Sequence, residues 1–187
     1  MALSYLTKWS EISMKNIQKL TLLCLLFSMT AMGVYAQENP FEAYKARWIG
    51  KPTPDFKFKD ISGKEFFISD LQGKVILLNF WFTNCSGCKA EYPGLQTLKS
   101  RFNDPSKVAF LSLATDNKEK LMAFLQKNPL NFQHMASSYD IGGIIYGVLG
   151  YPTNIIVDQS GIIRHIKIGG SAQSADDLEY EMKLLIR

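Results

Sequence analysis

Cysteine and histidine are scarce in this chain of 187 residues, which contains three cysteines and two histidines. Cys24 lies in an apolar N-terminal run, which leaves Cys85 and Cys88 for the rest of the chain. A disulfide between these two closes a loop too short to add much stability. A structural zinc site needs four ligands, and only His134 and His165 could join the pair. The scarcity therefore favours a reactive thiol pair over a structural disulfide or a zinc site.

An excess of charge of one sign is also missing. The formal net charge is only +4. Of the 21 basic and 17 acidic residues, the first 36 positions hold three lysines and one glutamate, so 18 basic and 16 acidic residues remain. A domain this close to neutral gives no indication of nucleic-acid binding. With no internal repeat and no low-complexity tract, one buried core accounts for the composition.

The longest apolar run is short for a membrane span. It extends over residues 20–34, below the ~20 residues that a spanning helix needs. Lys15 and Lys19 precede it and the small residue Ala36 follows it. This order is typical of a secretory signal peptide, and we predict one over residues 1–36. A retained membrane anchor is the alternative.

Three parts follow from this pattern. Residues 1–36 form the signal peptide, for which Met14 is the natural start, residues 37–49 form a polar lead, and residues 50–187 form one domain. Export predicts a periplasmic protein. The alternative is a domain anchored to the inner membrane that faces the periplasm.

Hydrophobic periodicity divides the domain into strands and helices. Two short apolar segments, Phe56 to Phe58 and Phe66 to Ile68, flank turn residues and predict an N-terminal hairpin. Further strands are expected at residues 75–81, 108–114, 131–135, 154–157 and 162–168. Helices are expected at residues 88–102, at 117–127 and from Ser174, whose spacing to Asp177 resembles a capping box. This order implies a mixed sheet between layers of helices.

The cysteine pair stands where a buried strand gives way to a helix. Unpaired N–H groups at a helix N-terminus favour an anion and therefore stabilise a Cys85 thiolate. Cys88, three residues later, is placed to attack a mixed disulfide on Cys85 and release the reduced partner. The spacing therefore predicts thiol-disulfide exchange.

The segment Trp81-Phe82-Thr83-Asn84-Cys85-Ser86-Gly87-Cys88-Lys89-Ala90-Glu91-Tyr92-Pro93 resembles the active-site segment of TlpA/ResA-type thioredoxin-like proteins. The resemblance extends to the entry segment Gly50 to Phe56 and to Gly150-Tyr151-Pro152-Thr153. It implies a thioredoxin-like three-layer α/β/α sandwich with a mixed central sheet and an added N-terminal β-hairpin. It also implies an exported thiol-disulfide oxidoreductase.

The resemblance assigns roles to residues near the cysteines. It implies that Pro152 is cis and that Tyr151 and Pro152 bind the partner segment that carries the reacting thiol. It also implies that Glu91, one helical turn after Cys88, transfers a proton to and from the resolving thiol. Thioredoxins carry a buried aspartate where this chain has Asn79.

Three other aromatic or basic residues are less clearly placed. Trp81 is expected to contact partners, with core packing as an equal alternative. His165 alternates with apolar neighbours and is expected to face solvent, while His134 has no assigned role. No metal and no cofactor is expected.

The expected partners are exported protein thiols and disulfides, together with an upstream redox partner. Membrane contact is expected only if the N-terminal segment is retained. The resemblance favours a reductant, but Ser86-Gly87 replaces the family's frequent X-Pro pair and leaves the direction of electron flow open. A peroxiredoxin-like peroxidase is disfavoured because Leu78 and Phe82 stand where its proline and threonine are needed. A Cu(I)-binding module is the remaining alternative, and it would require a histidine near the thiols.

Overall fold

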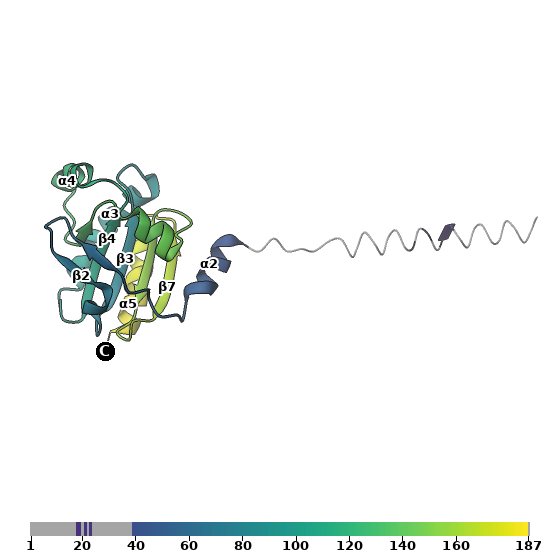
Figure 1. Ribbon diagram of the computed structural model, residues 1–187. Helices are drawn as coiled ribbons and strands as arrows, with labels where there is room; N and C mark the ends of the chain where they lie inside the picture. The colour runs from purple at the N-terminus through teal and green to yellow at the C-terminus, as the bar shows by residue number, and fades with distance from the viewer. Residues whose placement is uncertain (1–17, 20, 22, 24–38, 187) are drawn as a thin grey trace, which may run out of the picture. The chain divides into compact units, whose positions relative to one another are not determined.

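The computed structural model describes residues 18–19, 21, 23 and 39–186 (Figure 1). The predicted signal peptide lies almost entirely outside the described residues, and a compact unit begins at Pro40. Among the described residues, no helix is both long and apolar enough to cross a membrane.

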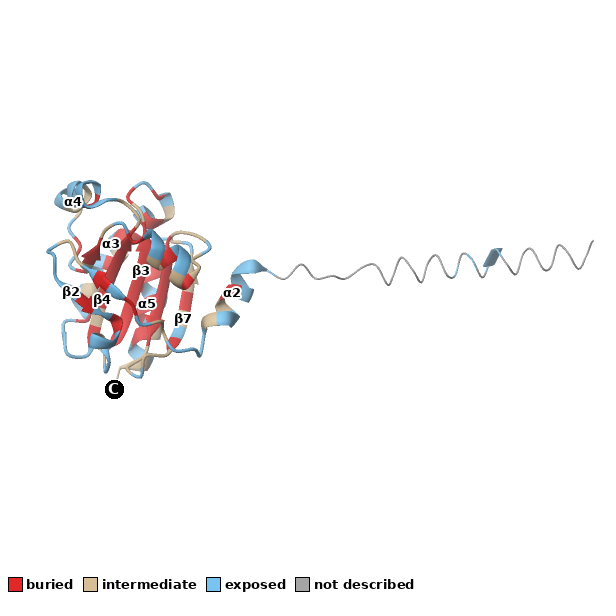
Figure 2. Ribbon diagram, viewed as in Figure 1, coloured by how far each residue is buried: buried red, intermediate tan, exposed pale blue. Residues whose placement is uncertain are grey.

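A five-stranded mixed sheet forms the centre of this unit (Figure 1). Its strands, in spatial order, are β5 (Gln133–Met135), β4 (Val108–Ala114), β3 (Val75–Trp81), β6 (Thr153–Val157) and β7 (Ile163–Ile168). β3, β4 and β5 are parallel, whereas β6 is antiparallel to β3 and β7 is antiparallel to β6. β3 is buried along its whole length (Figure 2), which explains its almost unbroken apolar sequence.

One face of the sheet is covered by three helices. They are α3 (Ser86–Arg101), α4 (Lys118–Lys127) and α5 (Ser174–Leu185), and all three contribute apolar residues to the core on this face. α3 and α5 approach each other closely at Gly94, because a Cβ atom there would lie 2.7 Å from the Cβ of Ala175. This packing holds the start of α5 against the helix that carries the cysteines.

The opposite face is covered by shorter elements. They are α2 (Pro40–Trp48), the hairpin of β1 (Lys57–Lys59) and β2 (Glu65–Phe67), the 3-10 helix η1 (Ile68–Leu71) and the π-helical η2 (Ile141–Tyr146). A second apolar core lies between these elements and the sheet. In the hairpin Phe58 pairs with Phe66, and both rings are buried in this core. Tyr44 of α2 and Tyr146 of η2 lie in the same core.

This arrangement confirms the predicted thioredoxin-like fold, including the mixed sheet with helices on both sides and the added hairpin. Helix α2 was not predicted, because it lies in the polar lead and Tyr44 is its one buried residue. The predicted capping box at α5 is wrong. The N-cap is Gln173, whose side chain makes no capping bond, and Ser174 is the first residue inside the helix. The buried Ser174 hydroxyl instead accepts a hydrogen bond from Ser171 N–H at 3.0 Å.

Candidate active site

The two cysteines lie at the junction of β3 and α3, as the sequence predicts. Cys85 is the N-cap of α3, and its Sγ accepts a hydrogen bond from Cys88 N–H at 3.1 Å. The two side chains form a disulfide across a Cα–Cα distance of 5.2 Å. The first turn of α3 contains no acidic residue, so the helix N-terminus can stabilise a Cys85 thiolate without opposition from a carboxylate in that turn.

The two cysteines differ slightly in exposure. Both are buried, but Cys85 retains 6% of its surface exposed and Cys88 only 2%. Cys85 is the N-cap at the end of the helix, while Cys88 lies inside its first turn. The less buried cysteine is therefore the one at the helix N-cap.

The loop before Cys85 is fixed by a residue that the sequence did not identify. Asp116, just after β4, accepts a hydrogen bond from Thr83 N–H and pairs with Lys120. Parallel strands β3 and β4 end at the same edge of the sheet, so the segments that follow them meet. An acidic residue directly after a buried parallel strand is the signal that could have indicated this contact.

Glu91 lies three residues after Cys88, on the same side of α3, with 1% of its surface exposed. Its carboxylate accepts hydrogen bonds from Asn79 Nδ2 at 3.0 Å and from Asn154 Nδ2 at 3.1 and 3.3 Å. Burial raises the pKa of Glu91 to about 7, while hydrogen bonds from Asn154, Asn79 and Ser174 oppose that rise. The group can therefore exchange a proton near neutral pH.

This buried carboxyl makes stability depend on pH. The folded pKa of about 7 exceeds the ordinary 4.5, so between these values the folded state keeps a proton that the unfolded chain releases. Linkage then requires the free energy of unfolding to fall as pH rises through this window, by about 3 kcal/mol in total. Glu91→Gln is expected to remove this slope in urea unfolding at pH 4.5 and 7, whereas Glu181→Gln keeps it. An unchanged slope in Glu91→Gln would contradict the assignment.

The peptide bond between Tyr151 and Pro152 is cis, as the family resemblance implies. A Cβ atom on Gly87 would lie 3.3 Å from Pro152 Cδ, so the proline packs against the residues between the two cysteines. The ring of Tyr151 packs edge-on against Phe82, with the ring centroids 5.6 Å apart. The loop before β6 therefore forms one wall beside the disulfide.

Gly170, after β7, completes this wall, and the sequence did not identify it. A Cβ atom there would lie 2.4 Å from Gly87 O and 2.7 Å from Pro152 Cγ. Only a residue without a side chain fits this position. The Gly-Gly pair that follows an amphipathic strand is the signal that could have indicated it.

Of the two roles that the sequence left open for Trp81, the structure has the core-packing one. Its side chain retains 2% exposure, and its Nε1–H donates to Ser112 Oγ at 2.7 Å. Its ring packs against Tyr92 and Phe124. Trp81 therefore belongs to the core between β3, α3 and α4.

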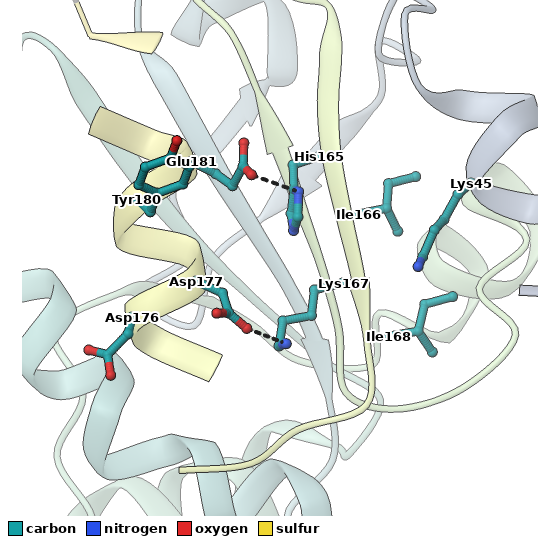
Figure 3. Close-up of a pocket in the computed structure, with 9 residues that line it drawn as sticks. All are labelled: Lys45, His165, Ile166, Lys167, Ile168, Asp176, Asp177, Tyr180 and Glu181. Atoms are coloured by element: carbon teal, nitrogen blue, oxygen red, sulfur yellow. Dashed lines mark hydrogen bonds and ion pairs between the residues drawn. The ribbon is translucent and has the colours of Figure 1, made fainter. Parts of the chain in front are cut away.

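His165 lies on the outer side of β7 but is half-buried, not fully exposed. It lines a cavity of about 450 Å³ between β7 and α5, with its Nδ1 3.7 Å from Glu181 Oε1 (Figure 3). Burial lowers the pKa of His165, and Glu181 opposes that effect. Figure 3 also shows Lys167 paired with Asp177 at 2.7 Å in the same cavity.

His134 is buried in β5, and its Nε2 lies 2.7 Å from Leu130 O. In the part of the chain that the structure describes, no cluster of three or more histidine, cysteine, aspartate or glutamate side chains could hold a metal ion.

Of the residues singled out in the sequence, the structure brings Cys85, Cys88, Glu91, Tyr151 and Pro152 together around the start of α3.

Known proteins are similar to this chain in sequence. The AhpC/TSA family matches residues 49–166. The thioredoxin-like protein YneN of Bacillus subtilis is 30% identical over 156 residues, which cover 80% of this chain and 89% of YneN. The thiol-disulfide oxidoreductase ResA of Bacillus cereus is 30% identical over 174 residues, which cover 90% of this chain and 96% of ResA.

Solved structures agree in fold. The thioredoxin domain of a thiol-disulfide oxidoreductase from Bacteroides vulgatus superimposes with a TM-score of 0.64 at 24% identity, covering 74% of this chain and 98% of that domain. The cysteine pair at the start of α3 lies within the matched family segment. The chain therefore belongs to the AhpC/TSA family and is a ResA-type thiol-disulfide oxidoreductase with a thioredoxin-like fold.

Proposed function

We propose that this protein reduces disulfides of exported partner proteins, with Cys85 as the attacking thiol and Cys88 as the resolving thiol. One observation carries this assignment of roles. Cys85 is the N-cap of α3 and the less buried of the two cysteines, and its Sγ accepts a hydrogen bond from Cys88 N–H at 3.1 Å. A thiolate at this position gains from the helix N-terminus and remains accessible to another protein.

The reaction consists of two exchanges at sulfur. The Cys85 thiolate attacks one sulfur of the partner disulfide, forming a mixed disulfide and releasing one partner thiolate. The Cys88 thiolate then attacks Cys85 Sγ, which re-forms the intramolecular disulfide and releases the second partner thiolate. Two electrons pass from the dithiol to the partner, and an upstream dithiol protein returns them to the Cys85–Cys88 disulfide by the reverse exchange.

Glu91 takes the proton in the second exchange. Cys88 must lose its proton before it can attack, and burial disfavours a free thiolate. Glu91 lies one helical turn away, and its pKa of about 7 matches the pH at which a general base works best. The carboxylate accepts the Cys88 proton in the reductive direction and returns it in the reverse direction.

The wall of Tyr151 and Pro152 receives the partner segment. Pro152 lies beside Gly87, which stands between the two cysteines in the sequence. The apolar rings of Tyr151 and Phe82 adjoin this position, so a partner cysteine in an extended segment can lie across them. The proposal of export is supported by the signal-like N-terminal sequence and places the protein in the periplasm.

Trapping of the mixed disulfide tests this proposal. In the full chain, Cys88→Ser leaves Cys85 without its resolving thiol, so a partner should stay covalently bound and be released by dithiothreitol. Cys85→Ser is the matched control and is expected to trap at least tenfold less, because Cys88 is more deeply buried. Preferential trapping by Cys85→Ser would reverse the two roles. Mass spectrometry of the trapped complex identifies the partner and the linked cysteine.

A further inference from the structure

A row of polar side chains crosses the sheet at one level. The strand registers pair His134 with Ser112, Ser112 with Asn79, Asn79 with Asn154, and Asn154 with Lys167. Paired residues on neighbouring strands project to the same face. Asn79 bonds to Glu91 of α3, so this is the face that α3 and α5 cover. Buried polar groups in an apolar core are costly unless they are hydrogen-bonded.

The two central members of this row converge on Glu91. Asn79 Nδ2 donates to Glu91 Oε1, and Asn154 Nδ2 donates to both carboxylate oxygens. Asn79 Nδ2 also donates to Asn154 Oδ1 at 2.8 Å, which fixes the orientation of the second amide. Each contact to Glu91 presents an N–H to an oxygen, which stabilises the carboxylate more than the protonated carboxyl group and so opposes the effect of burial.

We propose that Asn79 and Asn154 are positioning residues that stabilise the carboxylate form of Glu91 and thereby set the pH at which it accepts the Cys88 proton. The second half of this statement rests on the role proposed above for Glu91. The first half rests on the hydrogen bonds alone. A neutral donor at position 79 has a clear consequence: it supplies an N–H, whereas a carboxylate there would repel Glu91.

Among the groups around Glu91, the side-chain amides of Asn154 and Asn79 lower its pKa the most, and the other neighbours have smaller effects. From α5, a hydrogen bond from Ser174 lowers the pKa of Glu91. From β7, the positive charge of Lys167 lowers this pKa as well, but by less. Asp177 of α5 pairs with Lys167 at 2.7 Å and partly offsets that charge. On α3 itself, Cys88 is bonded to Cys85 in the oxidised protein.

The pKa of Glu91 in amide variants tests the proposal directly. Asn154→Ala removes two hydrogen bonds to the carboxylate, so the midpoint of Glu91 ionisation in the oxidised full chain should rise by about one pH unit, a tenfold change. Carbon-13 NMR of labelled glutamate carboxyls measures it. If Asn154→Ala does not fold, Asn79→Ser and Ser174→Ala each remove one donor and should shift the midpoint in the same direction.

A matched control comes from the same row. Ser112→Ala removes a buried hydroxyl that accepts a hydrogen bond from Trp81, so it costs stability without touching Glu91. Its Glu91 midpoint should stay at the wild-type value. A shift as large in Ser112→Ala as in Asn154→Ala would attribute the effect to general loosening of the core and overturn the proposal.

Two readouts separate this inference from the proposed function. If the Glu91 midpoint and the pH profile of mixed-disulfide resolution rise together in Asn154→Ala, the proposal stands. If the midpoint rises while the profile stays, Glu91 is not the proton acceptor and the pH-setting role fails. If the midpoint does not move, the amides do not hold the carboxylate, whatever Glu91→Gln does to the reaction.

Discussion

Glu91→Gln is expected to slow resolution of the mixed disulfide at pH 7 by about 100-fold, the lower end of what a positioned general base contributes. Glutamine has nearly the same shape, and its carbonyl oxygen can keep the N–H bonds made to one carboxylate oxygen. Its amide nitrogen cannot accept the bond from Asn154 to the other oxygen, and the side chain cannot take the Cys88 proton. In the wild type, resolution should accelerate with rising pH until the pKa of about 7 is passed. In the variant that inflection should disappear, and the rate should follow the ionisation of the Cys88 thiol itself.

The chromogenic disulfide dithionitrobenzoate separates the two exchanges. Attack by Cys85 releases the first coloured thiolate, and attack by Cys88 releases the second, so stopped-flow absorbance records both phases. The first phase should be nearly unchanged in Glu91→Gln and the second should be slow. Glu181→Gln, which alters a carboxylate in the cavity of Figure 3, should leave both phases intact. Equal slowing of both phases would show that Glu91 acts on Cys85 or on the fold, and not on resolution.

Gly170→Ala is expected to lower the free energy of unfolding and to slow the first thiol-disulfide exchange. Its Cβ would lie 2.4 Å from the carbonyl oxygen of Gly87 and 2.7 Å from Pro152 Cγ. Neither neighbour is the flexible end of a long side chain, so the backbone beside the disulfide must move. Overpacking of this kind costs about 1–3 kcal/mol. A misplacement near 1 Å at a reacting centre can cost about 100-fold in rate, and we expect at least a tenfold loss in the first exchange.

Gly143→Ala provides the comparison for this variant. A Cβ atom at Gly143 would lie 3.7 Å from the Tyr139 ring, an ordinary contact, and Gly143 lies away from the cysteines in η2. It should unfold in urea and react with dithionitrobenzoate like the wild type. Wild-type behaviour in Gly170→Ala would mean that the wall of Gly87, Pro152 and Gly170 adapts without consequence for the cysteines.

Local patterns were enough to place the cysteine pair. The apolar run of β3 and the helical spacing after Cys88 put both thiols at a strand–helix junction, and the structure has Cys85 as the N-cap. The cis form of Pro152 came from family resemblance, since sequence alone favours trans for most prolines. Glu91 was found in the same way, because its spacing from Cys88 does not distinguish a buried acid from an exposed one.

The partners of Glu91 could not be predicted without strand register. Asn154 lies 63 residues after Glu91 along the chain, and it reaches the carboxylate only because β6 pairs with β3. The sequence offered one indication of this contact: Asn154 is a polar residue in the otherwise apolar, buried strand β6. The role of Trp81 stayed open between two alternatives for a related reason. An aromatic residue at a strand end can pack in the core or face a partner, and only its contacts with Tyr92 and Phe124 of other elements decide between these.

Catalysed reduction of insulin tests the central claim most directly. With dithiothreitol as electron donor, the wild-type chain should precipitate the insulin B chain well ahead of dithiothreitol alone, and Cys85→Ser should lose this advantage completely. Mass spectrometry should show that the reduced protein gains two hydrogens and that both are lost on reaction. A wild-type rate equal to that of dithiothreitol alone, or full activity in Cys85→Ser, would contradict the assignment of Cys85 and Cys88 as a pair that exchanges disulfides with proteins.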